Sequence, residues 1–215
     1  AFAGNFSDDE IVEAMRYLHA RGKKGYITLN IVANDDDFIG LGEYLNLLVK
    51  AKVDAVIVSD LGVVRFIREN APALNIHVST QANVNNYYSA KVFVDMGATR
   101  IVLAREMNLK QIKAMHEKLG SSVELEAFVH GAMCISYSGR CLLSNYFTGR
   151  DANLGACTHP CRWKYYIVEE NRPGEYLPIE ENERGTYIFN SKDLCMIGHI
   201  PDLVNAGKDI PSGDR

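Results

Sequence analysis

The residues best suited to chemistry lie close together in the second half of the chain. Four of the five cysteines are Cys134, Cys141, Cys157 and Cys161, with the spacing C-x(6)-C-x(15)-C-x(3)-C. Thiolate is a soft ligand that binds zinc or the iron of iron–sulfur clusters. Free cysteines also occur as small buried hydrophobes, but four in one loop-rich stretch argue against that interpretation. The pattern therefore predicts a metal centre with these four thiols as ligands.

Two kinds of metal centre are compatible with this spacing. Structural zinc sites usually bring their ligands as two close pairs, and only Cys157 and Cys161 are that close. The wider gap between Cys134 and Cys141 suits a loop folded around a 4Fe–4S cluster, which needs four thiolates. We favour the cluster and keep zinc as the alternative. His159 or Cys195 replacing one of the four ligands is a further alternative.

Basic and aromatic side chains are interleaved with the cysteines. The basic residues are Arg140, Arg150, Arg162 and Lys164, and the aromatic residues are Tyr146, Phe147, Trp163, Tyr165 and Tyr166. Phosphate contacts combined with base stacking are typical of single-stranded RNA recognition. The alternative is a solvated face with ordinary core aromatics. Because the whole chain has a net charge of -4, any RNA-binding surface must be local.

Short apolar strands alternating with amphipathic helices precede this stretch. Strands are predicted at 26–32, 55–58, 76–78, 100–104 and 123–129, and helices from Ser7, over about 38–48, 63–69 and 88–96, and over 109–119. This alternation predicts an α/β fold with a parallel sheet. No G-x-G-x-x-G turn follows a strand, so we favour a barrel over a doubly wound sheet. A complete barrel needs eight units, which makes this an incomplete TIM-like (β/α) barrel.

Polar residues follow the predicted strands, and in a barrel these positions share one rim where such folds place their sites. The fifth strand leads the cysteine stretch to that rim. We therefore predict a pocket lined by neighbouring strand ends. The candidate catalytic residues are Glu126, His130, Arg105 and Glu106, and the candidate substrate-binding residues are Gln81, Arg140, Arg150 and Arg162.

The predicted organisation is one barrel fragment over residues 1–215, with its first and last units missing, and an insertion over 130–185. The insertion contains the cysteine-rich loop and a β-hairpin from Arg162 to about Glu183. A further strand at 186–189 follows, with Ser191 to Asp193 capping a final helix over 197–203. No apolar run approaches the roughly 18–20 residues of a membrane span, and no signal peptide is visible. We expect a cytoplasmic protein with no membrane partner, in which thiols stay reduced.

The pattern E-x-F-x(2)-G-A-M-C-x(4)-G-x-C-x-L-S, from Glu126 to Ser144, resembles the signature of the collagenase-like peptidase family U32. The resemblance continues through 150–153 and 161–163. Upstream and downstream stretches also resemble this family, at 5–7, 79–83, 103–106 and 190–194. The resemblance covers nearly the whole chain. It implies an incomplete β/α barrel that lacks a first βα unit and a later segment similar to K-I-E-G-R.

Two activities are implied by the resemblance. Some members of the family are described as collagenases, whereas others take part in oxygen-independent or prephenate-dependent RNA hydroxylation and in ubiquinone hydroxylation, with four cysteines holding an iron–sulfur cluster. The branch that this chain resembles most helps to make 5-hydroxyuridine at the tRNA wobble position. Prephenate as co-substrate, tRNA as substrate and a paralogous family subunit as partner follow as expectations.

The residues favour RNA hydroxylation over proteolysis. The chain contains no H-E-x-x-H and no G-x-S-x-G. A cysteine peptidase would pair Cys134 with His130, which leaves three cysteines unexplained. Iron–sulfur-dependent tRNA hydroxylation is therefore the leading hypothesis. A collagenase-like peptidase and a zinc-stabilised, non-catalytic RNA-binding module are the alternatives.

Overall fold

The computed structural model describes residues 5–131, 133–134, 136–163, 165–168, 170–171, 173–178, 181–182, 185–186 and 194–206. The chain forms two compact units. The sheet unit contains the chain up to Phe128 and again from His199, and the cysteine unit runs from Val129 to Gly198. The predicted insertion at 130–185 lies inside the cysteine unit.

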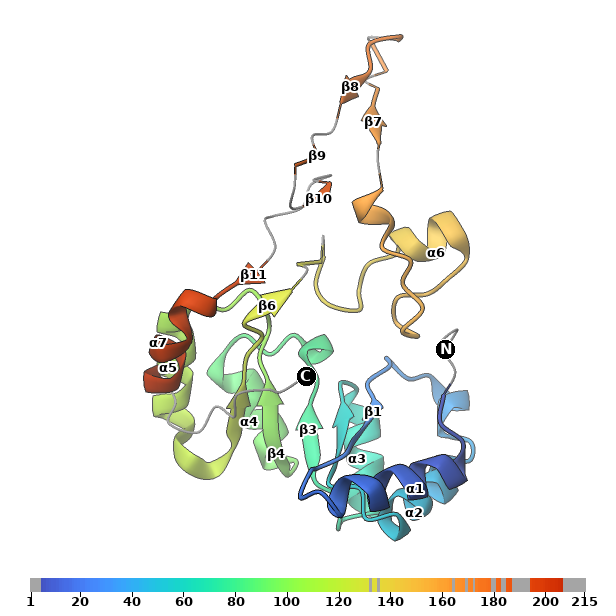
Figure 1. Cartoon of the computed structure of the whole chain (residues 1–215), viewed down its shortest axis with the longest axis vertical. Helices are drawn as coiled ribbons and strands as arrows, with labels where there is room; N and C mark the ends of the chain where they lie inside the picture. Colours follow the sequence, from blue (N-terminus) through green and yellow to red (C-terminus); the bar gives the residue numbers. More distant parts are fainter. Residues whose placement is uncertain are drawn as a thin grey trace. The chain divides into compact units, whose positions relative to one another are not determined.

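The sheet unit alternates strands with helices (Figure 1). Its strands are β1 (Tyr26–Leu29), β2 (Ala55–Val58), β3 (Ile76–Val78), β4 (Ala98–Val102) and β5 (Glu124–Glu126). Its helices are α1 (Asp8–His19), α2 (Leu41–Lys50), α3 (Leu61–Asn70), α4 (Tyr87–Asp95), α5 (Leu109–Leu119) and α7 (Ile200–Ala206). Short 3-10 turns are η1 (Asp35–Phe38), η2 (Thr80–Ala82), η3 (Gly120–Ser122) and η5 (Ile197–His199).

Side-chain caps fix where several of these helices begin. The Ser7 hydroxyl accepts from the Glu10 N–H while the Glu10 carboxylate accepts from the Ser7 N–H, which is the predicted capping box. The carboxylate of Asp60 accepts from the N–H groups of Gly62 and Val63 at the start of α3. Each cap satisfies backbone donors that the helix itself leaves unpaired.

The five strands pair in parallel in the order β1-β2-β3-β4-β5. A doubly wound sheet reverses its strand order at a switch point, so the sequential order excludes that arrangement. The α/β fold and the parallel sheet are confirmed, while closure into a barrel is not shown by the described strands. Helix α7 follows the cysteine unit in sequence and packs against α5.

The two faces of the sheet differ in polarity. One face carries Val56, Ile76 and Ile101, which are fully buried. Val58 and Val78 lie on the same face, where Val56 is opposite Ile76 and Val78 is opposite both Val58 and Ile101. Right-handed crossovers place the connecting helices on a single face, which accounts for this apolar layer. The opposite face carries polar side chains at matching register positions, among them His77, Arg100 and Glu124.

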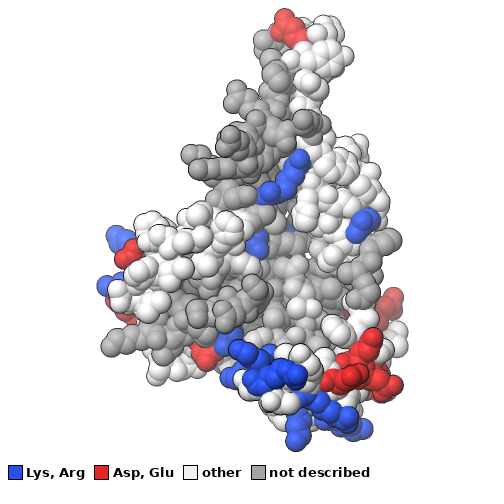
Figure 2. Space-filling model, in the orientation of Figure 1, with Lys and Arg blue, Asp and Glu red and all other residues white. Residues whose placement is uncertain are grey.

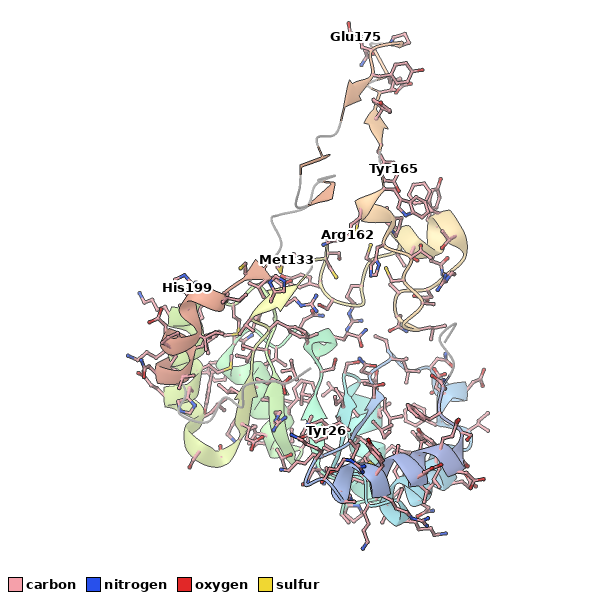
Figure 3. The ribbon with its side chains drawn as sticks, in the orientation of Figure 1. Tyr26, Met133, Arg162, Tyr165, Glu175 and His199 are labelled. Carbon is pink, nitrogen blue, oxygen red and sulfur yellow. The ribbon has the colours of Figure 1, made fainter. Side chains whose placement is uncertain are left out.

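The cysteine unit is built from short elements. It contains β6 (His130–Gly131), α6 (Leu143–Thr148), η4 (Pro160–Arg162), β7 (Tyr166–Ile167), β8 (Leu177–Pro178), β9 (Glu181–Asn182), β10 (Gly185–Thr186) and β11 (Leu194–Cys195). β7 pairs with β8 in an antiparallel hairpin, as the sequence predicted, and Glu175 lies near its tip (Figure 3). β9 pairs with β10, and β6 pairs with β11.

The predicted elements agree with the structure in type and differ at their ends. β4 begins two residues earlier than predicted, and β1 and β5 are shorter. The predicted helix over 38–48 divides into η1 and α2, because Gly40 adopts a left-handed conformation between them. Thr186, the first residue of the predicted strand at 186–189, lies in β10, while residues 187–189 and the cap at 191–193 lie outside the described residues. Among the described residues, no helix is long and apolar enough to cross a membrane.

Candidate active site

Hydrogen bonds join the carboxyl ends of neighbouring strands in the sheet unit. The Ser59 hydroxyl donates to the Asn30 carbonyl at 2.8 Å, and the Asn30 amide donates to the Ser79 hydroxyl at 3.4 Å. The Thr80 hydroxyl donates to the Leu103 carbonyl at 3.1 Å. The polar residues that follow the strands therefore meet at one edge of the sheet, as their sequence positions predicted.

Three predicted site residues of the sheet unit lie along this edge. Gln81 is in η2, directly after β3, and its Oε1 atom is buried without a hydrogen-bond partner in the described structure. A buried acceptor of this kind is costly unless a donor reaches it, so it is suited to a ligand. The guanidinium of Arg105 lies 4.2 Å from the centre of the Phe128 ring, and Glu106 is exposed.

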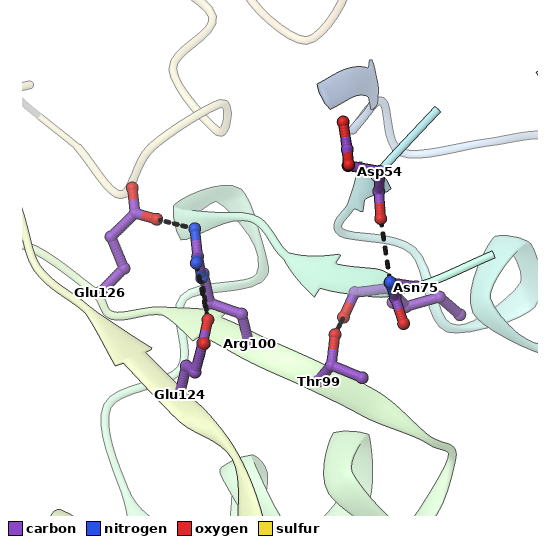
Figure 4. Close-up of polar contacts among 7 residues, drawn as sticks. Asp54, Asn75, Thr99, Arg100, Glu124 and Glu126 are labelled. Carbon is purple, nitrogen blue, oxygen red and sulfur yellow. Dashed lines mark hydrogen bonds and ion pairs between the residues drawn. The ribbon is translucent and has the colours of Figure 1, made fainter. Parts of the chain in front are cut away.

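Glu126, the fourth predicted residue of this unit, is held by Arg100 (Figure 4). The Arg100 guanidinium contacts the Glu126 carboxylate at 3.2 Å and the Glu124 carboxylate at 2.6 Å. Burial lowers the pKa of Arg100, but the hydrogen bond and charge of Glu124 outweigh it and the net pKa is raised. Glu126 is thus fixed in position by a cation, which suits an electrostatic or orienting role.

The sequence did not predict the polar network on the face of the sheet that carries His77, Arg100 and Glu124. His77 is buried, with its ring 4.8 Å from that of Tyr26 in an edge-on arrangement. Burial, and then the nearby Arg100 charge, lower the pKa of His77 to about 4. A pocket of about 250 Å³ opens beside these residues at the amino ends of the strands. Arg100, a charged residue directly before the apolar run 101–104, was the signal in the sequence that could have indicated this network.

In the cysteine unit, α6 connects the two halves of the cysteine pattern. Cys141 lies just before α6, and Cys157 directly precedes Thr158. The Thr158 N–H donates to the Ser144 hydroxyl at 3.0 Å, and the hydroxyls of Ser144 and Thr158 lie 3.1 Å apart. Ser144 is almost fully buried, so this polar contact is shielded from water. It fixes the segment containing Cys157 against the helix that follows Cys141.

The segment from Cys157 to Cys161 is a tight turn. His159 adopts a left-handed conformation with φ of 54° immediately before Pro160, which opens η4. Its backbone N–H donates to the Cys157 sulfur at 3.4 Å, and the Leu143 N–H donates to the Cys141 sulfur at 3.5 Å. Hydrogen bonds to cysteine sulfur are among the features that tune iron–sulfur centres.

The four predicted ligands act on one another electrostatically. All are free thiols. Burial raises the pKa of the Cys161 thiol, and Cys141, Cys157 and Cys134 raise it further, whereas Arg162 lowers it. As placed, the cysteines do not form a ready group of three or more metal ligands within the described residues. The donor set still fits a thiolate-bound metal, since metal binding displaces the thiol protons and is coupled to local folding.

The other predicted residues of the cysteine unit have different surroundings. Arg140 is exposed, and Arg150 and Arg162 are half-buried. His130 is exposed on β6, opposite Cys195 of β11, and His159 is also exposed. Arg162 and Tyr165 extend from the part of the unit around η4 (Figure 3). The Tyr165 hydroxyl is buried without a partner in the described structure; burial and then Cys161 raise its pKa.

Comparison with known proteins places the chain among sequences of one family. The sequence model of peptidase family U32 matches residues 1–210. "Uncharacterized protease MJ0090" of Methanocaldococcus jannaschii is 44% identical over 207 residues, which cover 95% of this chain and 49% of that protein. "tRNA hydroxylation protein P" of Escherichia coli is 36% identical over 241 residues, which cover 94% of this chain and 53% of that protein.

The fold also has a solved counterpart. The structure titled "The Structure of the U32 Peptidase Mk0906" has a TM-score of 0.53 and 20% sequence identity, covering 81% of this chain and 71% of that one. At this identity the likeness concerns the fold. The chain spans about half the length of the curated relatives described above.

Proposed function

We propose, from the premise that the chain belongs to peptidase family U32, that it is part of an iron–sulfur-dependent enzyme that hydroxylates the wobble uridine of tRNA. The observation that carries the proposal is the set of four free thiols, held around α6 and η4, in a chain similar to a tRNA hydroxylation protein. The fold that goes with it is an incomplete (β/α) barrel, which the sequential strand order supports.

The four cysteines have one role in this proposal. Cys134, Cys141, Cys157 and Cys161 hold a 4Fe–4S cluster, which supplies one-electron chemistry when bound. The backbone N–H groups of Leu143 and His159 that donate to two of the sulfurs would orient these ligands. Zinc bound by the same thiols, in a non-catalytic RNA-binding module, is the alternative for this site.

The remaining predicted residues bind and orient the substrates. The guanidinium groups of Arg140, Arg150 and Arg162 bind tRNA phosphates or the carboxylates of prephenate, since arginine matches both in bidentate geometry. The unpartnered Oε1 of Gln81 accepts a hydrogen bond from substrate. Glu126, held by Arg100, orients donor groups of the substrate.

A collagenase-like peptidase is the second candidate, because the family and one relative carry protease names. Its nucleophile would be Cys134 with His130 as base. Cleavage of gelatin by the metal-free protein, and its loss in Cys134→Ala but not in Cys157→Ala, would support this candidate. Gelatin left intact under all conditions would remove it.

The test of the leading proposal is nucleoside analysis of tRNA by mass spectrometry. A strain without the gene is expected to lose 5-hydroxyuridine, and the wild-type gene restores it. Cys157→Ser is expected to fail to restore the modification, whereas Cys195→Ser, a matched exposed cysteine outside the four, restores it. Unchanged 5-hydroxyuridine in the deletion strain would sink the proposal.

A further inference from the structure

The cysteine unit carries a group of large aromatic and apolar side chains around α6, of which four are exposed and one, Tyr165, is half-buried. We propose that this group, the α6 platform (Leu142, Tyr146, Phe147, Trp163 and Tyr165), binds unpaired bases of single-stranded RNA beside the cysteine centre. The inference rests on the proposed function, because it names how the RNA substrate of that same site is held.

Exposure is the first observation. Tyr146 is 82% exposed and Leu142 is 74% exposed. Phe147 and Trp163 are also exposed. A stable core would cover side chains of this size, and contiguous exposed apolar groups mark binding surfaces.

Ring geometry is the second observation. The Phe147 ring lies 6.0 Å from that of Trp163 and 5.9 Å from that of Tyr165. Trp163 and Tyr165 are nearly parallel, with an interplanar angle of 16°, and Tyr146 meets Phe147 edge-on at 5.2 Å. These contacts restrict the rings, so little side-chain entropy remains to be lost when a base stacks on them. Stacking on aromatic rings accepts every base, because each has a flat π-face.

A pocket lies between the platform and one of the cysteines, Cys141. It has a volume of about 550 Å³ and is lined by Ser136, Arg140, Cys141, Leu142, Leu143 and Tyr146. Ligand pockets commonly have volumes of about 300–1,000 Å³. A base lying against Tyr146 is therefore next to Cys141, one of the predicted cluster ligands.

Charge indicates which partner the platform takes. Residues 129–163 contain three arginines and one aspartate, a formal net charge of +2, whereas the whole chain has -4. The described charged side chains drawn over α6 and η4 in Figure 2 are basic. Arg140, at the edge of the pocket, has no ion pair within the described residues. Aromatic rings beside an available guanidinium are suited to a nucleotide, whose base stacks while its phosphate pairs.

Unpaired RNA fits these features better than duplex RNA. In an A-form duplex the bases are stacked inside, where aromatic side chains cannot reach their faces. A stem-loop exposes such faces, and the wobble uridine of the proposed substrate lies in a loop. The platform therefore binds the unpaired bases around the target nucleotide and holds them near the pocket.

The test measures binding of a fluorescently labelled tRNA anticodon stem-loop to the full-length protein by anisotropy. Tyr146→Ala is expected to weaken binding about tenfold, in the range of one lost stacked base. Leu142→Ala is expected to weaken it about threefold, because only an apolar contact with the base is lost. Tyr88→Ala, which removes a 78% exposed tyrosine from α4, is the matched control and is expected to bind like the wild type. Arg140→Gln is expected to lower the salt slope of binding by about 0.7, as for one lost phosphate contact on single-stranded RNA.

Several results would overturn the inference. The first is an unchanged affinity for the stem-loop in both Tyr146→Ala and Leu142→Ala. The second is that the wild-type protein binds the stem-loop and an RNA duplex with equal affinity. The third is self-association of the protein that Tyr146→Ala abolishes. The last result would identify a second copy of the protein as the occupant. Weakened stem-loop binding without any effect of the gene on 5-hydroxyuridine would retain the platform and reject the proposed function. If 5-hydroxyuridine depends on the gene but Tyr146→Ala and Leu142→Ala both bind the stem-loop like the wild type, the proposed function is retained and the platform is rejected.

Discussion

Replacing Arg100 by methionine removes the cation that two carboxylates share on the polar face of the sheet. The side chains of Arg100 and Glu126 are 10% and 17% exposed, so their contact at 3.2 Å is shielded from water. Loss of one partner of a buried pair costs about 3–5 kcal/mol. Because the Glu124 side chain is 49% exposed, its contact contributes at most about 1 kcal/mol. We therefore expect Arg100→Met to lower the free energy of unfolding by about 3 kcal/mol, near the lower end of the buried-pair range.

Urea denaturation followed by circular dichroism measures this change. The midpoint is expected to fall by about 1 M or more at an m-value of about 2–3 kcal/mol/M. Lys91→Met, which breaks the exposed i,i+4 pair with Asp95, is the matched control and is expected to cost less than about 0.5 kcal/mol. Adding Glu126→Gln to Arg100→Met should recover part of the loss, since it removes the carboxylate whose contact with Arg100 is lost. A loss below about 1 kcal/mol in Arg100→Met would refute the reasoning.

Two further predictions concern the same unit. Since the pKa of His77 falls from 6.5 to about 4 on folding, the unfolded state binds more protons between these pH values. The free energy of unfolding should therefore rise by about 2 kcal/mol from pH 4 to pH 6.5, and His77→Gln should flatten the dependence of the urea midpoint on pH in this range. An unaltered pH dependence in this variant would exclude His77 as its source. Gly97→Ala should lower the unfolding free energy by about 2 kcal/mol, because φ is +90° and the new Cβ would lie 2.8 Å from Arg68 Nε. Gly22→Ala, at φ +63° with no atom within 4 Å, should cost about half as much in thermal melts, and equal costs would contradict the role of Arg68.

The sheet was predictable because each of its elements carries a local signal. The apolar run 55–58 is typical of a strand even without its neighbours, and three of its four residues are buried. The capping box of Ser7 and Glu10 marks a helix start. Strand ends were less predictable. β4 begins at Ala98 because pairing with β3 includes Ala98 opposite Ile76, a non-local contact that propensity does not reveal.

The candidate site was predictable in its residue types and not in its contacts. Cysteine spacing singled out the three thiols, Cys134, Cys141 and Cys157, that act electrostatically on Cys161, because such residues are visible in the sequence alone. The Ser144–Thr158 contact joins residues fourteen positions apart, and Ser144 lies in α6, a helix that the sequence did not predict. Arg100 was missed as the partner of Glu126 because the pair depends on the register of β4 against β5. Long-range pairing of this kind becomes visible only in the folded chain.

Metal and sulfide analysis of the full-length protein, purified without oxygen, tests the central claim most directly. About four iron and four sulfide per chain are expected, as for a 4Fe–4S centre held by four cysteines. Cys134→Ser, Cys141→Ser, Cys157→Ser and Cys161→Ser should each lose this content, whereas Cys195→Ser should retain it. Stoichiometric zinc without iron, or loss of iron in Cys195→Ser with retention in Cys134→Ser, would contradict the account.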